Sequence, residues 1–243
     1  MRTMAFMRRN GREILRDPLT MVFGIGFPVI LLGLMTLIAR RAPVEIFQLE
    51  KLVPGVAAFG FSFISLFSAM LISRDRSSAL MMRLVSSPLR PEEFIMGYTL
   101  PLVPMAAAQC AICFLAARVL GLGFSWRTLA CMAALLPAAL IYIALGLMCG
   151  SLLTDKQVGG ICGALLTNLT AWMSGIWFDL ELIGGGFAKA ARMLPFANAV
   201  DAARAALAGD WAAMAQPLAV VSAYAVAGLM LAAMIFARRM RRQ

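Results

Sequence analysis

The chain contains no histidine and few charged residues. Among its 243 residues, Lys, Arg, Asp and Glu make up 14%, against about 25% in a typical soluble domain. The lack of histidine removes the commonest general base and the commonest metal ligand. Hydrophobic residues reach 62%, and the mean hydropathy is +0.85. The composition therefore indicates a membrane protein rather than a soluble domain.

Two nucleotide-related functions also lack their sequence signals. No G-x-x-x-x-G-K-[ST] sequence is present, so the chain cannot bind ATP through a phosphate loop. The net charge of +10 is not accompanied by a basic stripe on a soluble domain, which argues against nucleic-acid binding. Arginines that flank membrane spans and set their topology explain the charge better.

The five cysteines all lie in apolar segments. They are Cys110, Cys113, Cys131, Cys149 and Cys162. Cys110 and Cys113 form a C-x-x-C string, which can indicate a redox or metal site. Because no second cysteine pair lies in a loop, we favour two small apolar residues on a membrane helix.

Six apolar segments are long enough to cross the hydrocarbon core, which takes about 20 residues. None of them contains an ionised side chain. They are 19–39, 52–73, 94–117, 128–153, 157–178 and 213–237. Pro28 in the first segment and Pro137 in the fourth predict kinks. We therefore expect an all-α membrane protein whose single transmembrane domain, residues 1–243, has six spans.

Lys and Arg are unevenly divided between alternate loops. The arm 1–18, the loop 74–93, the turn 154–156 and the tail after residue 237 carry fourteen of the 22. The other eight are spread over longer loops on the opposite side. Because Lys and Arg are enriched in cytoplasmic loops, we expect both termini in the cytoplasm.

The arm 1–18 predicts an amphipathic helix in the membrane interface. At about 100° per residue, an apolar set occupies one arc and five arginines occupy the next. The apolar set is Met4, Met7, Gly11, Ile14 and Leu15, and the arginines are Arg2, Arg8, Arg9, Arg12 and Arg16. The arginines are expected to face anionic headgroups. Pro18 ends the helix before the first span.

The loop 74–93 is polar and helix-prone. Residues 77–86 favour a short helix that ends at Ser87-Pro88, since the residue before a proline disfavours the helical conformation. Pro91-Glu92-Glu93 then begins the next helix. Such an elbow is stiff enough to dock a soluble partner and transmit its motion into the membrane. An ordinary solvated loop is the alternative.

This loop resembles the cytosolic coupling segment of ABC-2 type transporter permeases. Leu84, Ser87-Pro88-Leu89 and Gly97 fit the family pattern. The departures are Ala79, Met82 and Tyr98, which stand where the pattern has Gly, Glu and Lys. The resemblance implies a coupling helix that contacts an ATPase subunit. The implied contact residues are Arg76, Arg83, Leu84, Ser87, Pro88 and Leu89.

Residues 179–212 are too polar for a full span but rich in Ala, Gly and Phe. Gly184-Gly185-Gly186 permits a tight reversal. Downstream, the sequence resembles the family's Asn-Pro…Asp-x-x-Arg segment, with Leu194 in place of Asn. The resemblance implies short re-entrant outer helices before the last span, with an outer gate at Pro195, Asp201 and Arg204. The i, i+3 spacing of Asp201 and Arg204 predicts an ion pair. A structural cap without substrate contact is an equal alternative.

Two spans carry faces that could line a pathway. In span five, Gly159-x-x-x-Gly163 is a close-packing motif, and Asn168 near mid-membrane needs a polar partner. Helix packing explains most such residues, whereas the resemblance places spans two and five at the pathway and the dimer seam. The pathway or seam residues are Phe59, Ser62, Phe63, Phe67, Gly163, Thr167, Asn168, Thr170 and Ser174. Gln109 in span three is a weaker candidate.

The resemblance to the ABC-2 (type V exporter) fold covers nearly the whole chain and implies an ATP-driven exporter. A second permease copy, as a homodimer rather than a heterodimer, and two separate ATPase subunits are the expected partners. The substrate would be amphiphilic: a drug, lipid, peptide or lipid-linked glycan, with multidrug efflux as the first choice. No cofactor is expected in this chain, and ATP and Mg²⁺ would bind the ATPase. The expected location is the cytoplasmic (inner) membrane of a prokaryote.

Two other classes of function were weighed. A secondary transporter of a small amphiphilic solute would need no ATPase, but it usually shows inverted repeats and an intramembrane carboxylate or histidine. A membrane-embedded enzyme would need a catalytic set inside the membrane. The predicted spans contain neither acids nor histidine, so both are less favoured, and no catalytic site is expected in this chain.

Overall fold

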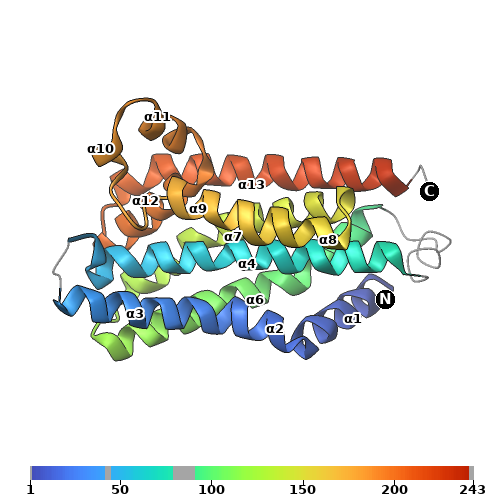
Figure 1. The fold of residues 1–243 in the computed structure, drawn as a ribbon, viewed down its shortest axis with the longest axis horizontal. Coiled ribbons are helices and arrows are strands. Elements are labelled where there is room, and N and C mark those ends of the chain that lie inside the picture. The colour runs from blue at the N-terminus through green and yellow to red at the C-terminus, as the bar shows by residue number, and fades with distance from the viewer. Residues whose placement is uncertain (1, 42–44, 79–90, 241–243) are drawn as a thin grey trace.

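The computed structural model describes residues 2–41, 45–78 and 91–240. The described part is all-helical and contains no strand. Five helices are long and apolar enough to cross a membrane, and they lie side by side along the long axis of the molecule (Figure 1). Their apolar stretches are Val22–Arg41, Leu49–Ser77, Glu93–Leu120, Trp126–Leu152 and Trp211–Arg239. The chain is therefore a multi-pass membrane protein.

The arm is helix α1 (Arg2–Arg16), at the end of the bundle where the C-terminal helix also finishes (Figure 1). We call this the terminal end. Its packed face is Phe6, Asn10 and Ile14, spaced i, i+4, i+8, and all three are buried. Met4 and Leu15 of the predicted apolar arc are 70% and 71% exposed. These two residues are free to face lipid, whereas Ile14 of the same arc lies on the packed face and helps to hold the arm to the protein.

The first span is interrupted by a π-helical turn. It comprises α2 (Pro18–Met21), η1 (Val22–Gly26) and α3 (Phe27–Arg41), and the N–H of Phe27 bonds the carbonyl of Val22. The cause is Pro28, which has no N–H to donate and whose ring clashes with the carbonyl four residues back. A wider turn just before the proline accommodates both effects, so the predicted distortion at Pro28 takes this form.

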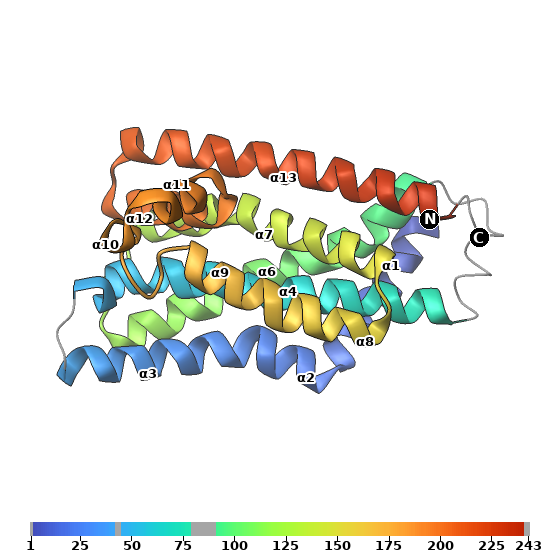
Figure 2. The ribbon, with the colours of Figure 1, turned by 45° about the horizontal axis from the view of Figure 1, so that its top comes forward.

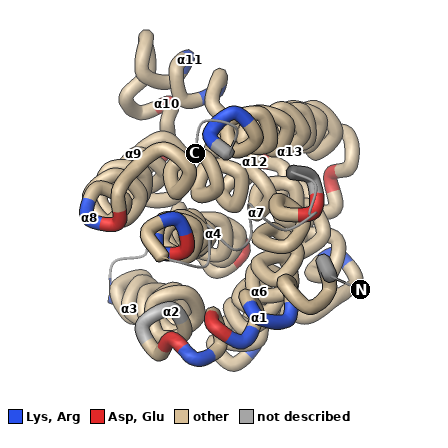
Figure 3. The backbone as a smooth tube through the Cα atoms, turned by 90° about the vertical axis from the view of Figure 1, so that its right-hand side faces the viewer, with Lys and Arg blue, Asp and Glu red and all other residues tan. Residues whose placement is uncertain are grey.

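Helix α4 (Leu49–Ser77) runs through the middle of the bundle, surrounded by the others when viewed from the terminal end (Figure 3). It is buried along most of its length, and it touches α3, α6, α7 and α12. Its sequence is apolar on all sides, as expected for a helix with no lipid-facing surface. A short 3₁₀ turn, η2 (Glu45–Phe47), precedes it.

Helices α6 (Pro91–Leu120) and α7 (Trp126–Leu152) form an antiparallel pair beside α4. The closest approach is between α4 and α7. A Cβ added at Gly150 would lie 2.6 Å from the carbonyl oxygen of Ala69, and one at Gly146 would lie 2.6 Å from Cβ of Ser68. Glycine at these two positions of α7 therefore lets the helix backbones meet, as small residues do in membrane bundles.

A continuous helical run follows α7, made of α8 (Asp155–Val158), η3 (Gly159–Leu166) and α9 (Thr167–Met173). It lies beside α4 and parallel to the long helices (Figure 2). The π-helical part of this run is eight residues long. It stops at Met173 rather than at the expected 178, because Gly175 adopts φ +67° and turns the chain.

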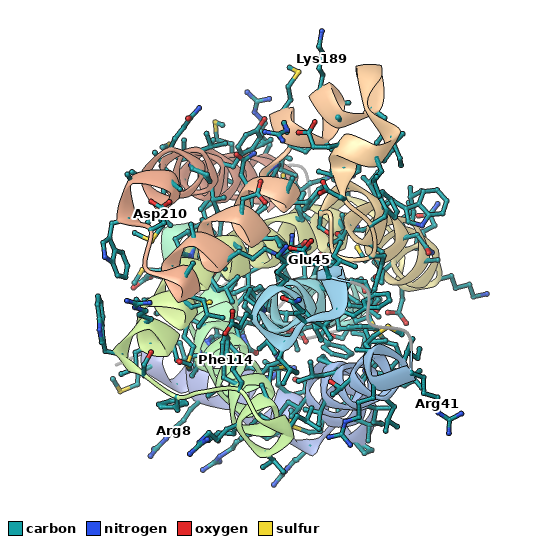
Figure 4. The ribbon with its side chains drawn as sticks, turned by 90° about the vertical axis from the view of Figure 1, so that its left-hand side faces the viewer. Arg8, Arg41, Glu45, Phe114, Lys189 and Asp210 are labelled. Carbon is teal, nitrogen blue, oxygen red and sulfur yellow. The ribbon has the colours of Figure 1, made fainter. Side chains whose placement is uncertain are left out.

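Three short helices precede the last span at the end of the bundle opposite the terminal end (Figures 1 and 2). They are α10 (Leu180–Ile183), α11 (Gly185–Met193) and α12 (Pro195–Ala208). The expected breaks at Gly184–Gly186 and at Pro195 both occur. Helix α12 packs on α7 and on α13 (Trp211–Met240), whereas Lys189 of α11 points away from the bundle (Figure 4).

Candidate functional site

Four consecutive side chains at the end of α4 together contact four other helices. We call them the α4 end cluster: Ser73, Arg74, Asp75 and Arg76. Charged residues of α1, α4 and α8 gather at this end of the bundle (Figure 3). The cluster lies where an otherwise apolar helix leaves the bundle core, and its polar groups reach partners on α1, α6, α7 and α8.

Asp75 is the centre of the cluster. Its carboxylate is 4% exposed and accepts two bonds from the guanidinium of Arg9, at 2.7 and 2.8 Å. The Tyr98 hydroxyl donates a third bond of 2.9 Å. The bond to Asp75 raises the pKa of Arg9 above its ordinary value, so Arg9 is charged at any working pH. This bidentate geometry is the strongest arrangement for such a pair.

The same contacts dock the arm. The ring of Phe6 packs edge-on against Tyr98, with centroids 5.0 Å apart. Gly97 leaves room for that ring, since a Cβ there would overlap it. Asn10, fully buried, donates a 3.0 Å bond to the carbonyl of Gly97. The family-pattern glycine of the sequence is thus the point at which α1 meets α6.

The other members of the cluster hold α7 and α8. Arg76 donates to the carbonyls of Gly150 and Leu153, at 2.8 and 3.2 Å. These groups end α7 and lack partners within their own helix. Ser73 donates a 3.1 Å bond to Asp155 at the start of α8, and the guanidinium of Arg74 lies 3.9 Å from the same carboxylate.

The cluster therefore ties α1, α6, α7 and α8 to α4 at one point. Because α4 extends to Ser77, the beginning of the expected loop 74–93 is helical and belongs to the span. Five of the six expected ATPase contacts lie outside the described residues. They are Arg83, Leu84, Ser87, Pro88 and Leu89. Arg76 lies within the described residues, and its guanidinium forms hydrogen bonds to carbonyls at the end of α7.

A cavity of about 860 Å³ opens beside the cluster, between α1, η1 and α4. Its volume is within the usual range for small-molecule sites. We call it the arm cavity. The lining from the arm is polar except for Ile14: Arg9, Arg12, Glu13, Ile14, Arg16 and Asp17. The remaining lining is apolar except for one arginine: Phe23, Phe63, Leu66, Phe67, Met70, Leu71 and Arg74.

Aromatic rings form part of the apolar wall of the arm cavity. Phe63 stacks on Phe23 with centroids 6.3 Å apart and meets Phe27 edge-on at 5.2 Å. Phe67 is buried against Gly24, where an added Cβ would lie 3.1 Å from its ring. The π-helical turn thus brings the first span against the aromatic face of α4.

The expected pathway residues of α4 fall into two groups. Phe63 and Phe67 line the arm cavity. Phe59 lies further along the same face and packs against Trp177, 6.0 Å between centroids. Ser62 is fully buried on another side, and its hydroxyl has no hydrogen-bond partner among the described residues. Of this set, Phe63 and Phe67 therefore line an open space, and Phe59 and Ser62 do not.

The expected residues of the fifth segment are divided in the same way. Thr170 is buried and accepts a 3.2 Å bond from the Tyr142 hydroxyl, and Ser174 is buried where the run ends. Thr167 and Asn168 bond backbone carbonyls of their own run, at 3.2 and 2.9 Å. A Cβ added at Gly163 would meet only Leu66 among the described residues, at 3.5 Å. Asn168 is exposed on the outside of the protomer.

At the opposite end, Arg204 holds the short helices to the spans. Its guanidinium donates to the carbonyl of Lys51 at 2.9 Å and to that of Gly175 at 3.1 Å. Among the ion pairs of the described residues, none joins it to Asp201, so the i, i+3 pair expected from sequence does not form. Asp201 is exposed, and Pro195 is buried at the first position of α12.

No cluster of potential metal ligands occurs within residues 2–41, 45–78 and 91–240. All five cysteines are free thiols, and Cys113 lies 3.8 Å from the amide nitrogen of Gln109. Gln109 also donates to the carbonyl of Ala57 at 3.2 Å. The C-x-x-C string is thus part of the α4–α6 packing.

Sequence reasoning did not single out the Arg9–Asp75–Tyr98 contact. Its members are 66 and 23 residues apart, and one of the three is a tyrosine. The available signal was Asp75 itself, an acid between two arginines at the end of a long apolar segment. A carboxylate in that place needs a cation or donors from another element.

Comparison with curated proteins finds no match to the chain. The family model described as ABC-2 family transporter protein matches residues 41–234. The match begins before α4 and ends within α13, so it includes the α4 end cluster and the outer helices. With most of its length matched, the chain belongs to the ABC-2 transporter family and is a membrane transport subunit, and this family implies association with ABC ATPase partners.

Proposed function

We propose that the chain is the permease subunit of an ABC exporter in the cytoplasmic (inner) membrane of a prokaryote. Two copies and two separate ATPase subunits would form one transporter for an amphiphilic substrate. The ATPase subunits bind ATP and Mg²⁺, and this chain needs no cofactor. Family membership supports the role of membrane subunit.

The α4 end cluster is the observation that carries the proposal. A permease must convert a force applied by its ATPase into movement of several helices. Here the chain continues from Ser78 directly into the segment that resembles the family's ATPase contact. The residues just before it are bonded to α1, α6, α7 and α8. A displacement at this point therefore reaches four elements besides α4.

The test is to separate ATP hydrolysis from transport. We expect the double change Arg83→Glu and Leu84→Glu to lower ATP-dependent transport in proteoliposomes and copurification of the ATPase, with normal membrane insertion. Arg118→Glu, on an exposed arginine at the other end of α6, is the matched control. Unchanged coupling and copurification would reject the ATPase contact, and transport that needs no ATP would favour a secondary transporter.

The proposed topology has six spans, with the run 155–173 as the fifth and both termini in the cytoplasm. Lys and Arg at the terminal end support this orientation. Cysteines at Ser77 and Gly186, both exposed, should be labelled from opposite sides of the membrane. Gly186 is preferred to Gly185, whose φ of +58° does not suit a side chain. Labelling of both from one side would reject the topology.

The fifth segment supports a homodimer. A Cβ added at Gly159 or Gly160 would meet nothing within 4 Å, so this small face is not used by the described part of the protomer. Small faces of this kind allow close packing of membrane helices. We expect Gly160→Cys to crosslink two copies in membranes, above the background of the native cysteines. Gly33→Cys, equally open but on α3, should not; equal crosslinking at both would contradict this seam.

A further inference from the structure

The arm cavity has one apolar side and one charged side, and we call the charged side its rim. Phe23, Phe63 and Phe67 belong to the apolar side, formed by η1 and α4, and the arginines of α1 belong to the rim. An apolar chain or ring can be buried inside while a polar head stays at the rim. The cavity therefore has the two-part chemistry of an amphiphile site.

Some of the charged residues at the rim already form ion pairs with described residues, and others do not. Arg9 is paired with Asp75 and with Glu13, the latter at 2.7 Å. Arg74 has Asp17 within 3.9 Å. Both acids of the lining are thus beside a cation. A charged head group in the cavity would therefore contact the rim residues that have no ion-pair partner in the described part of the chain.

Arg12 and Arg16 are the two rim arginines without an ion pair among the described residues. Both are exposed, and neither forms an ion pair with any described residue. They are one turn apart on α1, at i and i+4, so they lie on the same side of the helix. Two free guanidinium groups bind phosphate or carboxylate well and repel a cation.

We infer that the arm cavity binds an anionic amphiphile, with its phosphate or carboxylate at Arg12 and Arg16 and its apolar part against Phe23, Phe63 and Phe67. This inference rests on the proposed function only in naming the substrate class. It narrows that class: a cationic drug does not suit this rim. The arm then has two roles, to sit in the interface and to form one wall of the site.

A crosslinking experiment tests the site without transport. The full-length chain is placed in phosphatidylcholine nanodiscs with a photoreactive fatty acid, or with the same chain carrying a quaternary ammonium head. We expect the fatty acid to label the peptide that contains residues 63–71, and the cationic probe to label it at least about tenfold less, since one lost charged contact is worth about that factor.

The variants separate a built site from general attraction to a basic surface. Arg12→Glu with Arg16→Glu should reduce the fatty-acid label about tenfold or more. Arg8→Glu is the matched control: Arg8 lies on the same helix, is exposed and points away from the bundle (Figure 4), but does not line the cavity. Leu66→Trp, which fills the cavity, should also reduce the label.

Equal labelling by both probes, or an equal loss in Arg8→Glu, would overturn the inference. Addition of phosphatidylglycerol to the nanodiscs distinguishes two sources of the anion. Displacement of the probe identifies a membrane lipid as the occupant, and retention identifies a single-chain anion; either supports the shared chemistry. Because no ATPase is present, failure of ATP-driven transport would leave this result unchanged.

Discussion

At the scale of single residues, Asp75 has the most consequential surroundings. It is a buried carboxylate with three bonds from two other elements. Burial of an unpaired carboxylate is unfavourable by several kcal/mol, so removal of one partner affects stability more than the pair itself contributes. The cluster is therefore sensitive to a change on the cation side.

We predict that Arg9→Met destabilises the protein more than Asp75→Asn does. Arg9→Met leaves the Asp75 charge without its cation, and a loss of about 2 kcal/mol is expected, below the ~3–5 kcal/mol of a fully buried pair because Arg9 is 37% exposed. Asp75→Asn keeps an acceptor for Tyr98 and removes the charge. Thermal unfolding in detergent micelles measures both.

The double variant completes that test. With Asp75→Asn present, Arg9→Met should cost much less than it does alone, because no carboxylate is then stranded. Tyr98→Phe, which removes one bond to a charged group, should cost about 1.5–3 kcal/mol in the original background. Strictly additive effects of Arg9→Met and Asp75→Asn would contradict the contact.

The identity of these residues was only partly predictable. The arm and its arginines follow from the sequence, but the partner of Arg9 does not, since contacts across 66 residues depend on how the helices pack. Tyr98 stands where the family pattern has Lys, and its hydroxyl reaches Asp75. A lysine there would offer the same carboxylate a cation. The departure thus preserves a donor at this site.

At the scale of elements, apolar length predicted the long helices well and the backbone bonding inside them poorly. Five of the six expected segments are long helices. The remaining one, the fifth segment, is the helical run 155–173. The observed helix ends differ from the expected ends by a few residues, because polar residues such as Arg74–Ser77 continue the helix. The π-helical turns were not predicted: they reflect backbone bonding, which hydropathy does not report.

The choice of close-packing glycines was also incomplete. The spacing Gly159-x-x-x-Gly163 in the fifth segment predicted close packing, but Gly146-x-x-x-Gly150 makes the tight contact, between α7 and α4. Both have the same spacing, and only the partner distinguishes them. The motif predicts that a helix can be approached closely, and it does not say which neighbour does so.

We predict that Gly150→Ala destabilises the bundle by about 1–3 kcal/mol, the usual effect of overpacking. The new methyl group would lie 2.6 Å from the backbone oxygen of Ala69, which cannot move without displacing α4. Gly33→Ala on α3 has nothing within 4 Å and should be neutral or stabilising by up to about 1 kcal/mol, because alanine favours a helix. Thermal unfolding of both variants should differ in sign or clearly in size.

At the scale of the whole molecule, α4 connects two differently built ends. At the terminal end, ion pairs hold α1 and α8 to it. At the other end, Arg204 bonds the carbonyl of Lys51 in its first turn. The short outer helices are thus fastened to the helix that carries the α4 end cluster. A movement of α4 therefore bears on both ends.

The last prediction concerns this fastening. Replacing Arg204 with Met removes the donors to the carbonyls of Lys51 and Gly175. The carbonyl of Lys51 is within α4, whereas that of Gly175 loses its partner, and a buried acceptor without a partner costs about 1–3 kcal/mol. We expect lower thermal stability of the outer helices and reduced ATP-dependent transport. Arg204→Lys should restore little, because an ammonium lacks the planar fork that reaches both groups.

Asp201→Ala is the matched comparison, one helical turn away on α12. Sequence spacing alone made Asp201 the partner of Arg204, and this change would then be as damaging as Arg204→Met. The structure instead leaves Asp201 exposed and without an ion pair to Arg204 among the described residues, so its removal should alter stability by less than about 0.5 kcal/mol. Equal losses in the two variants, measured by unfolding and by transport in proteoliposomes, would show that charge pairing holds the outer helices rather than the carbonyl contacts of Arg204.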